Sequence, residues 1–572
     1  MTAIDAGVTA RPLSDRQTDI LVGAVVGLAS FLTIVGPAVL DVTNMLWLTQ
    51  DIDSFTHYIG WEFFRRSPWT WPLGMSPDYG LQFSSSIIFS DSIPLLAIPL
   101  KLLSPLLPKV FQYSGWWVFS CFLLQAYFAA RIAGLFTRDT IVKLALATLV
   151  TFAPPFLWRL SIHYSLVAHW LILAGLYLYW APNSPRRSLS WIVLLTGSVL
   201  IHTYFFGMLV PIWLASLVRR QLLDRSSPWL LEGGMVIAAA LAGLWTAGFF
   251  PLRSSMLSVG YGYFRLNLVA LINPQGSNDM GGGWAWSAFL PTMPRAFGDY
   301  EGFAYAGLGG LGAAALALPL VLTERGSYRG KGLWPLVVVA ILLTLFAISP
   351  NVAITDRGAQ IPVPQIVFDV ASLMRASGRF FWPVYYMIPL AAAWLLLRTM
   401  GLKYGRPLLV LLAMLQVYDI SPGWMALRSQ LALAGPRFDT SIDDPRLAEV
   451  AKHYKAVRAL PPATMMRTWE QIAYFALQVQ LPTDAAYLAR TDEAALKAFA
   501  DAANTDIAEH RLDPDALYFL SPDFATKVAT AMTPADAMFH IGDFYVYAPG
   551  WHAAELSTTL AESRPQGSPA TN

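Results

Sequence analysis

Long apolar runs, separated by short polar connections, dominate the chain up to about residue 421. A bilayer core of ~30 Å is crossed by a helix of about 20 mostly apolar residues. The run 188–218 is too long for one span and divides at His202–Tyr204. The pattern predicts eleven membrane spans, at 19–40, 113–132, 144–158, 164–181, 189–204, 205–218, 230–251, 303–323, 333–349, 381–398 and 407–421.

One further apolar stretch, 86–108, is interrupted by four prolines, Pro94, Pro99, Pro105 and Pro108. If this stretch does not cross, and the N-terminal tail 1–18 is cytoplasmic, every short basic connection falls on the cytoplasmic side, as the positive-inside rule favours. We therefore expect 86–108 to be a broken helix at the outer interface, within a first outer loop 41–112. No cleavable signal is evident, so the first apolar run is expected to remain as an anchor.

Composition supports a multi-pass membrane protein. Only 13% of residues are charged and 55% are hydrophobic, with a mean hydropathy of +0.47, whereas soluble domains carry roughly 25% charged residues. Cys121 is the sole cysteine, which excludes a disulfide framework and a cysteine metal cluster. No phosphate-binding loop, nucleophile elbow, zinc-protease motif or dinucleotide fingerprint is present. Nothing indicates ATP use or nucleic-acid binding.

The composition changes after the last predicted span. Helical patterns at 444–460 and 492–510 precede short strand-like runs at 516–520 and 542–549. This order predicts a small soluble α/β domain over 422–560, on the outer side of the membrane. The remaining residues, 561–572, are rich in Ser, Pro and Thr and are expected to be disordered.

The richest polar stretch is Gln50–Gly74, which follows the first span. Acidic, basic and aromatic residues alternate in it: Asp51, Asp53, His57, Tyr58, Trp61, Glu62, Arg65 and Arg66. Asp91 follows in the next stretch of the same loop. Such a mixture between membrane helices indicates a site that handles a polar group at the bilayer surface.

Several segments of the chain resemble a bacterial membrane family of unknown function, and the layout resembles the GT-C class of membrane glycosyltransferases. The segments are DSFTHYIGWEFFRRSPWTWPLG, SIIFSDSIPL, QYSGWW, IHYSLVAHW, NPQG, DYEGFAYAGLG and RASGRFFWP. The resemblance implies a GT-C-like, all-α polytopic domain over 19–421. It further implies an inverting enzyme of the bacterial inner membrane that passes a sugar from a polyprenyl-phosphate carrier to a glycan, lipid or protein acceptor. A carboxylate of the first outer loop would serve as base, at Asp51 or Asp53.

The carboxylates have two readings each. Asp53 stands four residues before His57, so both would share a helix face, and a positioned carboxylate contributes ~10²–10⁴-fold to a proton transfer. Alternatively, Asp51 or Asp53 caps a helix that begins near Ser54. Asp91 would be either a second carboxylate of the site or another cap.

A lipid-phosphate leaving group calls for cations, and the arginine fork binds phosphate oxygens in pairs. The candidates are Arg65, Arg66, Arg265, Arg375 and Arg379. Arg375 and Arg379 are four residues apart, which on a helix would present both from one face. The alternative is that these side chains only reach towards lipid phosphates at the span ends.

Four histidines lie near the predicted outer ends of spans: His57, His163, His169 and His202. A divalent metal could use them with Asp53 and Asp91, but their spacing favours buried, hydrogen-bonded histidines. No metal ligand is assigned, and His57, His169 and His202 are retained as substrate-binding candidates. In the aromatic loop 258–307, Asn273 and Gln275 suit a carbohydrate, against the alternative of an interfacial aromatic belt. Glu301 is a further candidate, because a charge at a span mouth is costly to desolvate.

Two other functions compete with the enzyme. A transporter or lipid flippase would carry charges near the middle of its spans and matched broken helices. A noncatalytic assembly protein for polysaccharide export would use the outer domain to bind a partner. The enzyme interpretation predicts that Asp53, Asp91 and an arginine converge on one outward-facing cavity.

Overall fold

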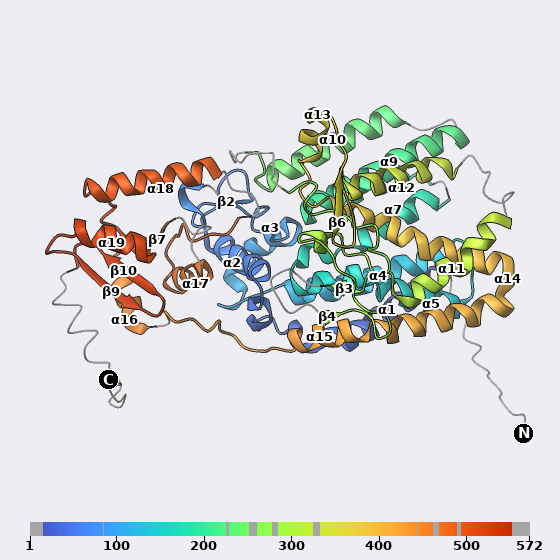
Figure 1. Ribbon diagram of the computed structural model, residues 1–572, viewed down its shortest axis with the longest axis horizontal. Coiled ribbons are helices and arrows are strands. Elements are labelled where there is room, and N and C mark those ends of the chain that lie inside the picture. Colours follow the sequence, from blue (N-terminus) through green and yellow to red (C-terminus); the bar gives the residue numbers. More distant parts are fainter. Residues whose placement is uncertain are drawn as a thin grey trace, which may run out of the picture.

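The computed structural model describes residues 15–83, 85–182, 184–224, 228–250, 260–276, 284–323, 332–442, 444–461, 468–488 and 493–551. It shows an elongated molecule with a helical bundle at one end and a smaller α/β domain at the other (Figure 1). The tail 561–572 and most of the segment 1–18 lie outside the described residues.

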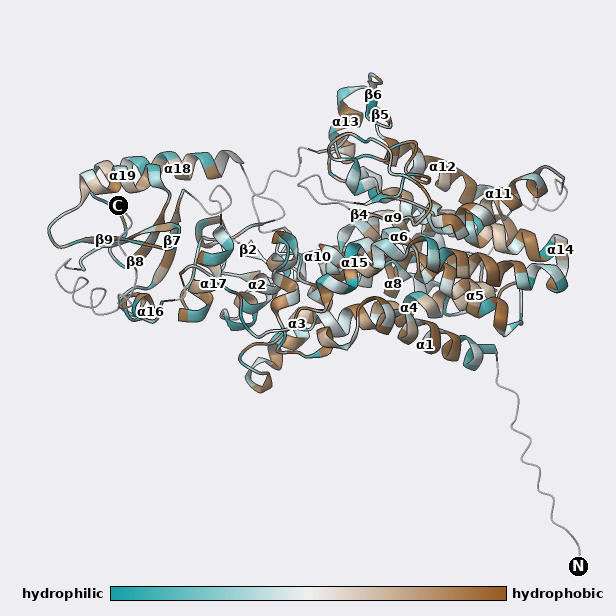
Figure 2. Ribbon diagram, turned by 60° about the horizontal axis from the view of Figure 1, so that its bottom comes forward, coloured by the Kyte–Doolittle hydropathy of each residue, from teal (hydrophilic) through white to brown (hydrophobic). Residues whose placement is uncertain are grey.

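Apolar helices form the bundle, as the hydropathy colouring of Figure 2 shows. Five helices are long and apolar enough to cross a membrane, or six if the bent pair 140–151 and 154–161 is one span. The five are α1 (Asp15–Ile34), α4 (Ser114–Ala133), α9 (Thr203–Asp224), α10 (Trp229–Thr246) and α14 (Trp382–Asp419). The first helix of the bent pair is α5 (Thr140–Thr151), and the second segment, Pro154–Ser161, starts with α6 (Pro154–Trp158). The two segments are bent by 47° relative to each other.

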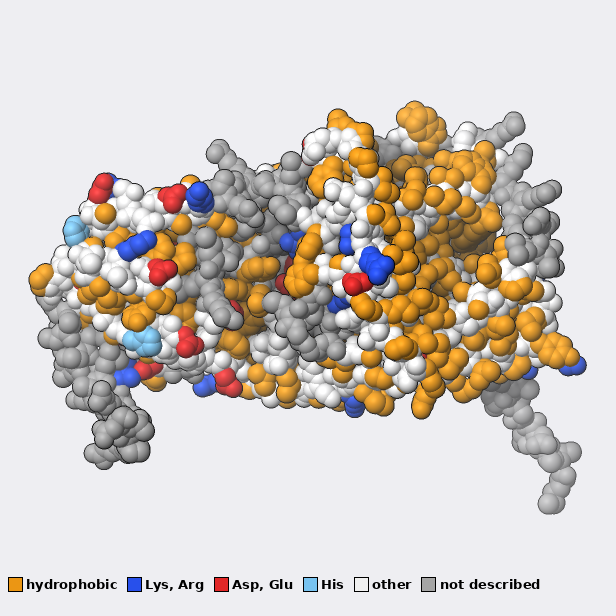
Figure 3. Space-filling view, in the orientation of Figure 1, with side chains coloured by type: hydrophobic (Ala, Val, Ile, Leu, Met, Phe, Trp, Pro, Cys, Tyr) orange, Lys and Arg blue, Asp and Glu red, His pale blue; other side chains and the backbone are white. Residues whose placement is uncertain are grey.

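Shorter apolar helices fill the rest of the bundle: α7 (Trp170–Trp180), α8 (Arg187–Ile201), α11 (Gly307–Thr323) and α12 (Trp334–Ile348). Their positions correspond to predicted spans. By length and composition, however, only five or six of the described helices are long and apolar enough to cross a membrane. The number eleven therefore stays a prediction. Hydrophobic side chains cover most of the visible face of the bundle (Figure 3).

The longest helix, α14, folds back on itself at Gly401. This residue has φ 67° and ψ 176°, which is not helical. A Cβ on Gly405 would lie 3.3 Å from the Leu397 Cα, so the chain on either side of Gly401 lies side by side. The two arms also meet the same neighbour, because Tyr385 donates to the Tyr305 carbonyl while the Tyr305 hydroxyl donates to Asp419. The arms match the two spans expected at 381–398 and 407–421.

Basic connections gather at the end of the bundle away from the α/β domain. Asp19, at the start of α1, accepts hydrogen bonds from Arg131 at the end of α4 (2.9 Å) and from Lys143 at the start of α5 (2.7 Å). Arg406, beyond the fold-back of α14, pairs with Asp139 at 3.3 Å. Close packing of α1 on α4 needs glycine, since a Cβ on Gly23 would lie 2.8 Å from the Tyr127 Cα.

The loop between α1 and α4 is built of short elements. They are η1 (Pro37–Leu40), η2 (Leu46–Thr49), α2 (Ile52–Arg66), β1 (Met75–Ser76), η3 (Leu81–Phe83), β2 (Ser85–Ser86), α3 (Pro94–Leu102) and η4 (Ser104–Leu106). With nine residues, α3 is ~14 Å long, too short to cross ~30 Å of hydrocarbon. Leu102 and Leu106 on this segment are 69% and 83% exposed.

Further short elements connect the later helices. They are η5 (Arg159–Ser161), η6 (Tyr164–Val167), β3 (Gln275–Gly276), β4 (Trp284–Ala285), η7 (Asp299–Gly302), β5 (Asn351–Ile354), β6 (Arg357–Gln360), α13 (Gln365–Ala371), η9 (Ser377–Phe381) and α15 (Ser421–Leu431). The last of these, α15, packs against α1 and β4.

The C-terminal domain contains a four-stranded sheet in the order β7-β8-β10-β9. Strands β7 (Ala456–Leu460) and β8 (Ala516–Leu520) are parallel, and β10 (Phe544–Ala548) is antiparallel to both β8 and β9 (Ala537–Ile541). Its helices are α16 (Pro445–Ala451), α17 (Trp469–Val479), α18 (Glu493–Ala508) and α19 (Pro522–Ala531). The predicted strand 516–520 coincides with β8.

One predicted element of this domain is wrong. The run 444–460 was expected to be helical, but the helix ends at Ala451 and residues 456–460 form β7. Every residue of the adjacent strand β8 is buried, and β7 pairs with it along its whole length. Pairing with a distant strand therefore overrides the local helical pattern.

Candidate active site

Helix α2 positions the first carboxylate. Asp51 has an extended conformation and its side chain accepts the Asp53 amide at 2.9 Å, so Asp51 is the N-cap of α2. The helix begins at Ile52, two residues earlier than expected, and Asp53 lies in its first turn. The capping alternative therefore describes Asp51, and the Asp53 side chain is free for another contact.

Two carboxylate–histidine contacts lie next to each other at the domain junction. Asp53 Oδ2 is 3.2 Å from His163 Nε2, and Asp91 Oδ1 is 3.7 Å from His202 Nε2. The carboxylate side chains are 33% and 21% exposed, whereas the histidine side chains are 10% and 12% exposed. The structure thus brings the two acids of the first loop against histidines that follow α6 and α8.

The loop that carries Asp91 is fixed directly on α2. Ser92 Oγ donates to the His57 carbonyl at 2.9 Å. A Cβ on Gly60 would lie 2.3 Å from the Ser90 Cβ, so only glycine lets the loop approach this closely. Asp91 itself has φ 53°, a conformation that aspartate tolerates better than most residues. The position of the second carboxylate is therefore set by the sequence around it.

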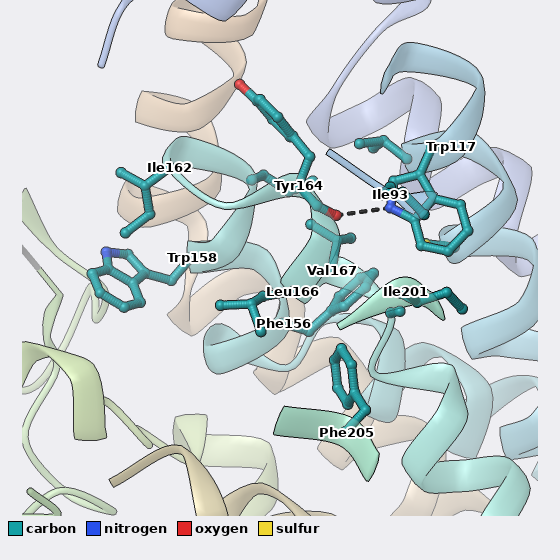
Figure 4. Packing of buried hydrophobic residues seen from close by; sticks show 14 of the residues in the cluster. Ile93, Trp117, Phe156, Trp158, Ile162, Tyr164, Leu166, Val167, Ile201 and Phe205 are labelled. Carbon is teal, nitrogen blue, oxygen red and sulfur yellow. Dashed lines mark hydrogen bonds between the residues drawn. The ribbon is translucent and has the colours of Figure 1, made fainter. Parts of the chain in front are cut away.

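His163 is held by the packing beneath it. The segment after α6 turns through η5 and η6, and the Trp117 indole donates to the Tyr164 carbonyl at 2.8 Å. Figure 4 shows this bond among buried residues such as Phe156 and Leu166. This bond anchors the peptide next to His163 to α4, and the His163 ring contacts Asp53.

Three charged residues form a buried network beside the carboxylates. Glu301 accepts two hydrogen bonds from Arg379, at 2.7 and 2.8 Å, and one from Arg159 at 2.9 Å. The Arg379 guanidinium also lies 4.7 Å from the Tyr204 ring centroid. The Tyr204 hydroxyl accepts the Ala376 amide at 2.8 Å, which ties the segment after α13 to α9.

Arg375 differs from Arg379. Its guanidinium lies 5.2 Å from the Phe264 ring centroid, and among the described residues it has no ion pair or hydrogen bond. Its charge lowers the pKa of both Asp53 and Asp91, which shows that it lies within electrostatic range of them. The two arginines do not share a helix face, because Ala376 between them is non-helical and η9 begins only at Ser377.

The surroundings change the acidity of these groups. The pKa of Asp53 is raised to about 8, first by burial and then by the charges of other carboxylates, of which Asp51 is the largest contributor. Burial raises the pKa of Asp91 to about 6 and lowers the pKa of His57 to about 3. The pKa of Glu301 lies well below its usual value despite burial, because Arg159 and Arg379 stabilise the carboxylate. Added positive charge near Asp53 would favour its ionised form.

Other candidates on α2 have structural partners. Arg65 and Arg66 both pair with the buried Glu62, at 3.1 and 2.5 Å, and donate to carbonyls of the 104–109 segment. The Trp61 indole donates to the Phe111 carbonyl at 2.9 Å, and Tyr58 is buried. Trp61, Arg65 and Arg66 therefore hold the first loop together, and the four residues lie five to thirteen positions after Asp53 along α2.

The structure also leaves some candidates outside the cluster. His169 Nδ1 is 2.8 Å from the Tyr386 hydroxyl, inside the bundle. The alternative of a buried, hydrogen-bonded histidine therefore describes His169. Asn273 hydrogen-bonds to the Met293 backbone and accepts the Gln275 amide, and the Gln275 carbonyl accepts a hydrogen bond from Arg295. Arg265 is likewise occupied by Asp299 and the Asn351 carbonyl.

Sequence reasoning did not select Arg159, Tyr204 or Tyr487 for the site. Tyr487 comes from the C-terminal domain; burial raises the pKa of its hydroxyl, the Asp53 charge raises it further and the Arg375 charge opposes this, which places Tyr487 within electrostatic range of both. Its ring stacks on Trp469 with centroids 6.0 Å apart. No local sequence pattern marks Tyr204 or Tyr487 as a site residue. Arg159 directly follows the predicted span 144–158, and this position at a span end is a signal that could have identified it.

Two cavities are described, and neither is lined by Asp53 or Asp91. One of about 570 Å³ lies between α5, α14 and α15, and one of about 590 Å³ is lined by residues near Gly260, Arg265 and Asp369. The outward-facing cavity expected around these carboxylates is therefore not one of the two, although the Asp53 and Asp91 side chains are partly exposed. Among the described residues, one group of side chains could hold a metal ion, formed by His57, Asp91 and His163.

Two solved structures of the Archaeoglobus fulgidus oligosaccharyltransferase resemble the chain. The first, AglB in complex with an inhibitory peptide and a dolichol-phosphate, is 11% identical, with a TM-score of 0.39 over 93% of this chain and 74% of that chain. The second, in complex with zinc and sulfate, is 12% identical, with a TM-score of 0.38 over 92% and 73%. No curated protein matches the sequence.

Family profiles match both parts of the chain. The profile of DUF6311, a domain of unknown function, matches residues 24–421, and that of the DUF6311 C-terminal domain matches residues 446–549. The first match ends just beyond α14, and the second begins within α16. The chain belongs to the DUF6311 family.

Proposed function

We propose that this protein is an integral-membrane glycosyltransferase that passes a sugar from a polyprenyl-phosphate carrier to a glycan, lipid or protein acceptor. The observation that carries the proposal is the meeting of Asp53 and Asp91 with His163, His202 and Arg375, an arginine without an ion pair or hydrogen bond to the described residues. These groups come from five segments of the chain, and they combine proton acceptors with a cation suited to phosphate.

Asp53 is the proposed base. It accepts the proton of the acceptor hydroxyl as that oxygen bonds to the anomeric carbon of the sugar. The bond from this carbon to the carrier phosphate breaks, and its electron pair leaves with the phosphate. A base works best with a pKa near the working pH, and a pKa of about 8 for Asp53 meets this condition. Attack opposite the leaving phosphate would invert the configuration.

Arg375 is the proposed phosphate ligand. Arg379 shares its donors with Glu301 in a buried pair, so its contribution is to hold the segment that follows Arg375. The carrier's lipid tail would lie beside α3, whose exposed Leu102 and Leu106 suit the outer interface. We place the protein in the inner membrane of a bacterium, with its N-terminus in the cytoplasm and its C-terminal domain in the periplasm.

The proposal is tested by sugar transfer in a purified system. Protein in lipid nanodiscs is given polyprenyl-phosphate-linked hexoses labelled in the sugar, together with a cell-envelope extract that supplies acceptor hydroxyls, and movement of the label from the carrier to the acceptor is followed. We expect Asp53→Asn to lower turnover by ~10²–10⁴-fold, the usual contribution of a general base. Asp41→Asn is the matched control, because Asp41 lies on the same loop and, among the described residues, its carboxylate accepts hydrogen bonds from Thr43 alone. Wild-type turnover by a folded Asp53→Asn variant would refute the assignment.

The chemistry of the acceptor is found by comparing glycans of cells that lack the chain with those of their parent. A missing sugar that returns with the wild-type chain, and not with Asp53→Asn, would identify the product. Unchanged glycans, lipids and glycoproteins would contradict the proposed transfer. This comparison needs no prior choice of sugar, so it complements the purified assay.

A further inference from the structure

We propose that His57, Asp91 and His163 form a binding site for a divalent transition-metal ion such as zinc or manganese. Each residue offers one ligand atom, and these atoms lie within 4.8 Å of one another. They come from α2, from the loop before α3 and from the turn before η6, three segments that the fold brings together. Metal binding itself stands apart from the proposed enzymatic function, whereas a role of the metal in catalysis rests on it.

The first argument is the state of the imidazoles. His57 Nε2 and His163 Nδ1 are buried and have no hydrogen-bond partner within the described part of the chain. Buried polar atoms are nearly always paired, so an additional ligand would account for both. His169 Nε2 also lacks a partner but belongs to no such group of ligand atoms, so the grouping with a carboxylate carries more weight than a free nitrogen alone.

The second argument is the ring of residues that orients the ligands. Asp53 Oδ2 contacts His163 Nε2 at 3.2 Å. A carboxylate on the second nitrogen of a histidine is the usual support for a metal-bound imidazole. His202 stands 3.7 Å from Asp91, and Ser92 locks the Asp91 loop onto the His57 carbonyl. The two proposed imidazole ligands and the carboxylate are therefore held by neighbours outside the set.

The donor atoms decide the class of metal. Two imidazoles and one carboxylate suit zinc, manganese, iron or cobalt, whereas calcium and magnesium prefer oxygen alone. Ligand atoms around zinc at 2.0–2.1 Å are roughly 3.3 Å apart, so the side chains would close in by up to about 1.5 Å. Three protein ligands leave a coordination position open, and one carboxylate does not neutralise a divalent ion. An anionic phosphate oxygen or a water molecule could complete the shell.

The test is metal content and affinity, measured without sugar transfer. Wild-type protein in nanodiscs is stripped with a chelator and titrated with Zn²⁺, read by elemental analysis, and with Mn²⁺, read by electron paramagnetic resonance. We expect one tightly held ion per chain. His57→Gln, His163→Gln and Asp91→Asn should each lose at least tenfold in affinity, while Asp53→Asn should keep the stoichiometry with affinity lowered ~10–100-fold. His540→Gln, at an exposed position of β9, is the matched control.

The outcomes separate the two proposals. Absence of stoichiometric Zn²⁺ or Mn²⁺ binding by the wild-type chain overturns the metal site, even if a variant fails to fold. Binding that is equal in wild type and in all three ligand variants overturns it as well. One ion bound by wild type and lost from the ligand variants supports the site, whether or not sugar is transferred. Transfer that persists in metal-free protein would leave the glycosyltransferase proposal standing and exclude the metal from catalysis.

Discussion

Glu301 illustrates how much of this molecule depends on single buried charges. Its side chain is 5% exposed and is shared by Arg159 of η5 and Arg379 of η9. Removing the carboxylate would leave two buried guanidinium groups without their partner. Loss of one member of such a buried network costs about 3–5 kcal/mol.

Glu301→Gln should therefore lower the thermal unfolding midpoint of the purified protein clearly. Glu449→Gln is the matched control, since its pair with Lys452 is 66% and 65% exposed and worth at most ~1 kcal/mol. Because the folded-state pKa of Glu301 lies below the usual 4.5, its contribution is complete above pH 4.5 and declines as the pH falls further. The gap between wild type and Glu301→Gln should narrow in acid. Equal midpoints at neutral pH would contradict the buried network.

Residue-scale predictions from the sequence succeeded where a local rule sufficed. Asp51 caps α2, as one of the two readings of that motif expects. For Arg65 and Arg66 the sequence predicted phosphate ligands, but the structure shows both paired with Glu62. Glu62 stands three and four residues before these arginines, a spacing that favours ion pairs on a helix. The contact between Asp53 and His163 had no such signal, because it joins residues 110 positions apart.

At the scale of elements, glycines set how closely neighbouring segments approach. Gly115 is the second residue of α4, and a Cβ there would lie 1.8 Å from the Val39 carbonyl oxygen in η1. Gly197 lies inside α8 with no neighbouring atom within 4 Å of the same position. The two glycines therefore differ in packing although both lie in apolar helices.

Gly115→Ala should reduce the yield and the unfolding midpoint of the folded protein, because the backbone of η1 would have to move. Gly197→Ala should be neutral or stabilising by up to ~1 kcal/mol, the usual gain in helix propensity. Fluorescence size-exclusion chromatography of the two variants, followed by a thermal ramp, measures both effects. Similar behaviour of the two variants would show that η1 does not pack on α4 as described.

Elements were predictable where one period of hydrophobicity applied throughout. The apolar runs located the helices of the bundle, and the short run 516–520 located β8. The prediction was wrong at 444–460, where pairing with β8 selects a strand over the helix that the local pattern indicates. The spans themselves were counted from length alone, and several apolar helices, such as α7, are too short to qualify by themselves.

At the scale of the whole molecule, the fold-back of α14 and the C-terminal domain lie at opposite ends of the long axis (Figure 1). Arg398, Lys403 and Arg406 surround the fold-back, and such a basic turn is expected in the cytoplasm. The C-terminal domain would then lie on the other side of the bilayer. The site lies at the junction where α2 meets α17.

Single-cysteine labelling tests this orientation. Cys121, the sole native cysteine, is buried and should be silent. Lys403→Cys and Glu449→Cys introduce thiols at exposed positions of the fold-back and of the C-terminal domain. A membrane-impermeant maleimide added outside intact spheroplasts should label only the thiol at position 449, and lysis should expose the one at 403. Labelling of both from one side would contradict the predicted topology.

Docking of the C-terminal domain on the first loop determines when the candidate site is completed during synthesis of the protein. Arg66 and Gly80 of the first loop, 41–112, donate hydrogen bonds to the Leu477 and Thr483 carbonyls of this domain. The ribosome synthesises the first loop early, whereas Leu477 and Thr483 are added hundreds of residues later. A nascent chain already threaded into the bilayer would hold its carboxylates uncovered until the last domain has been exported and has folded. The candidate site is therefore expected to be complete only after translation ends, and the proposed sugar transfer would begin after biogenesis.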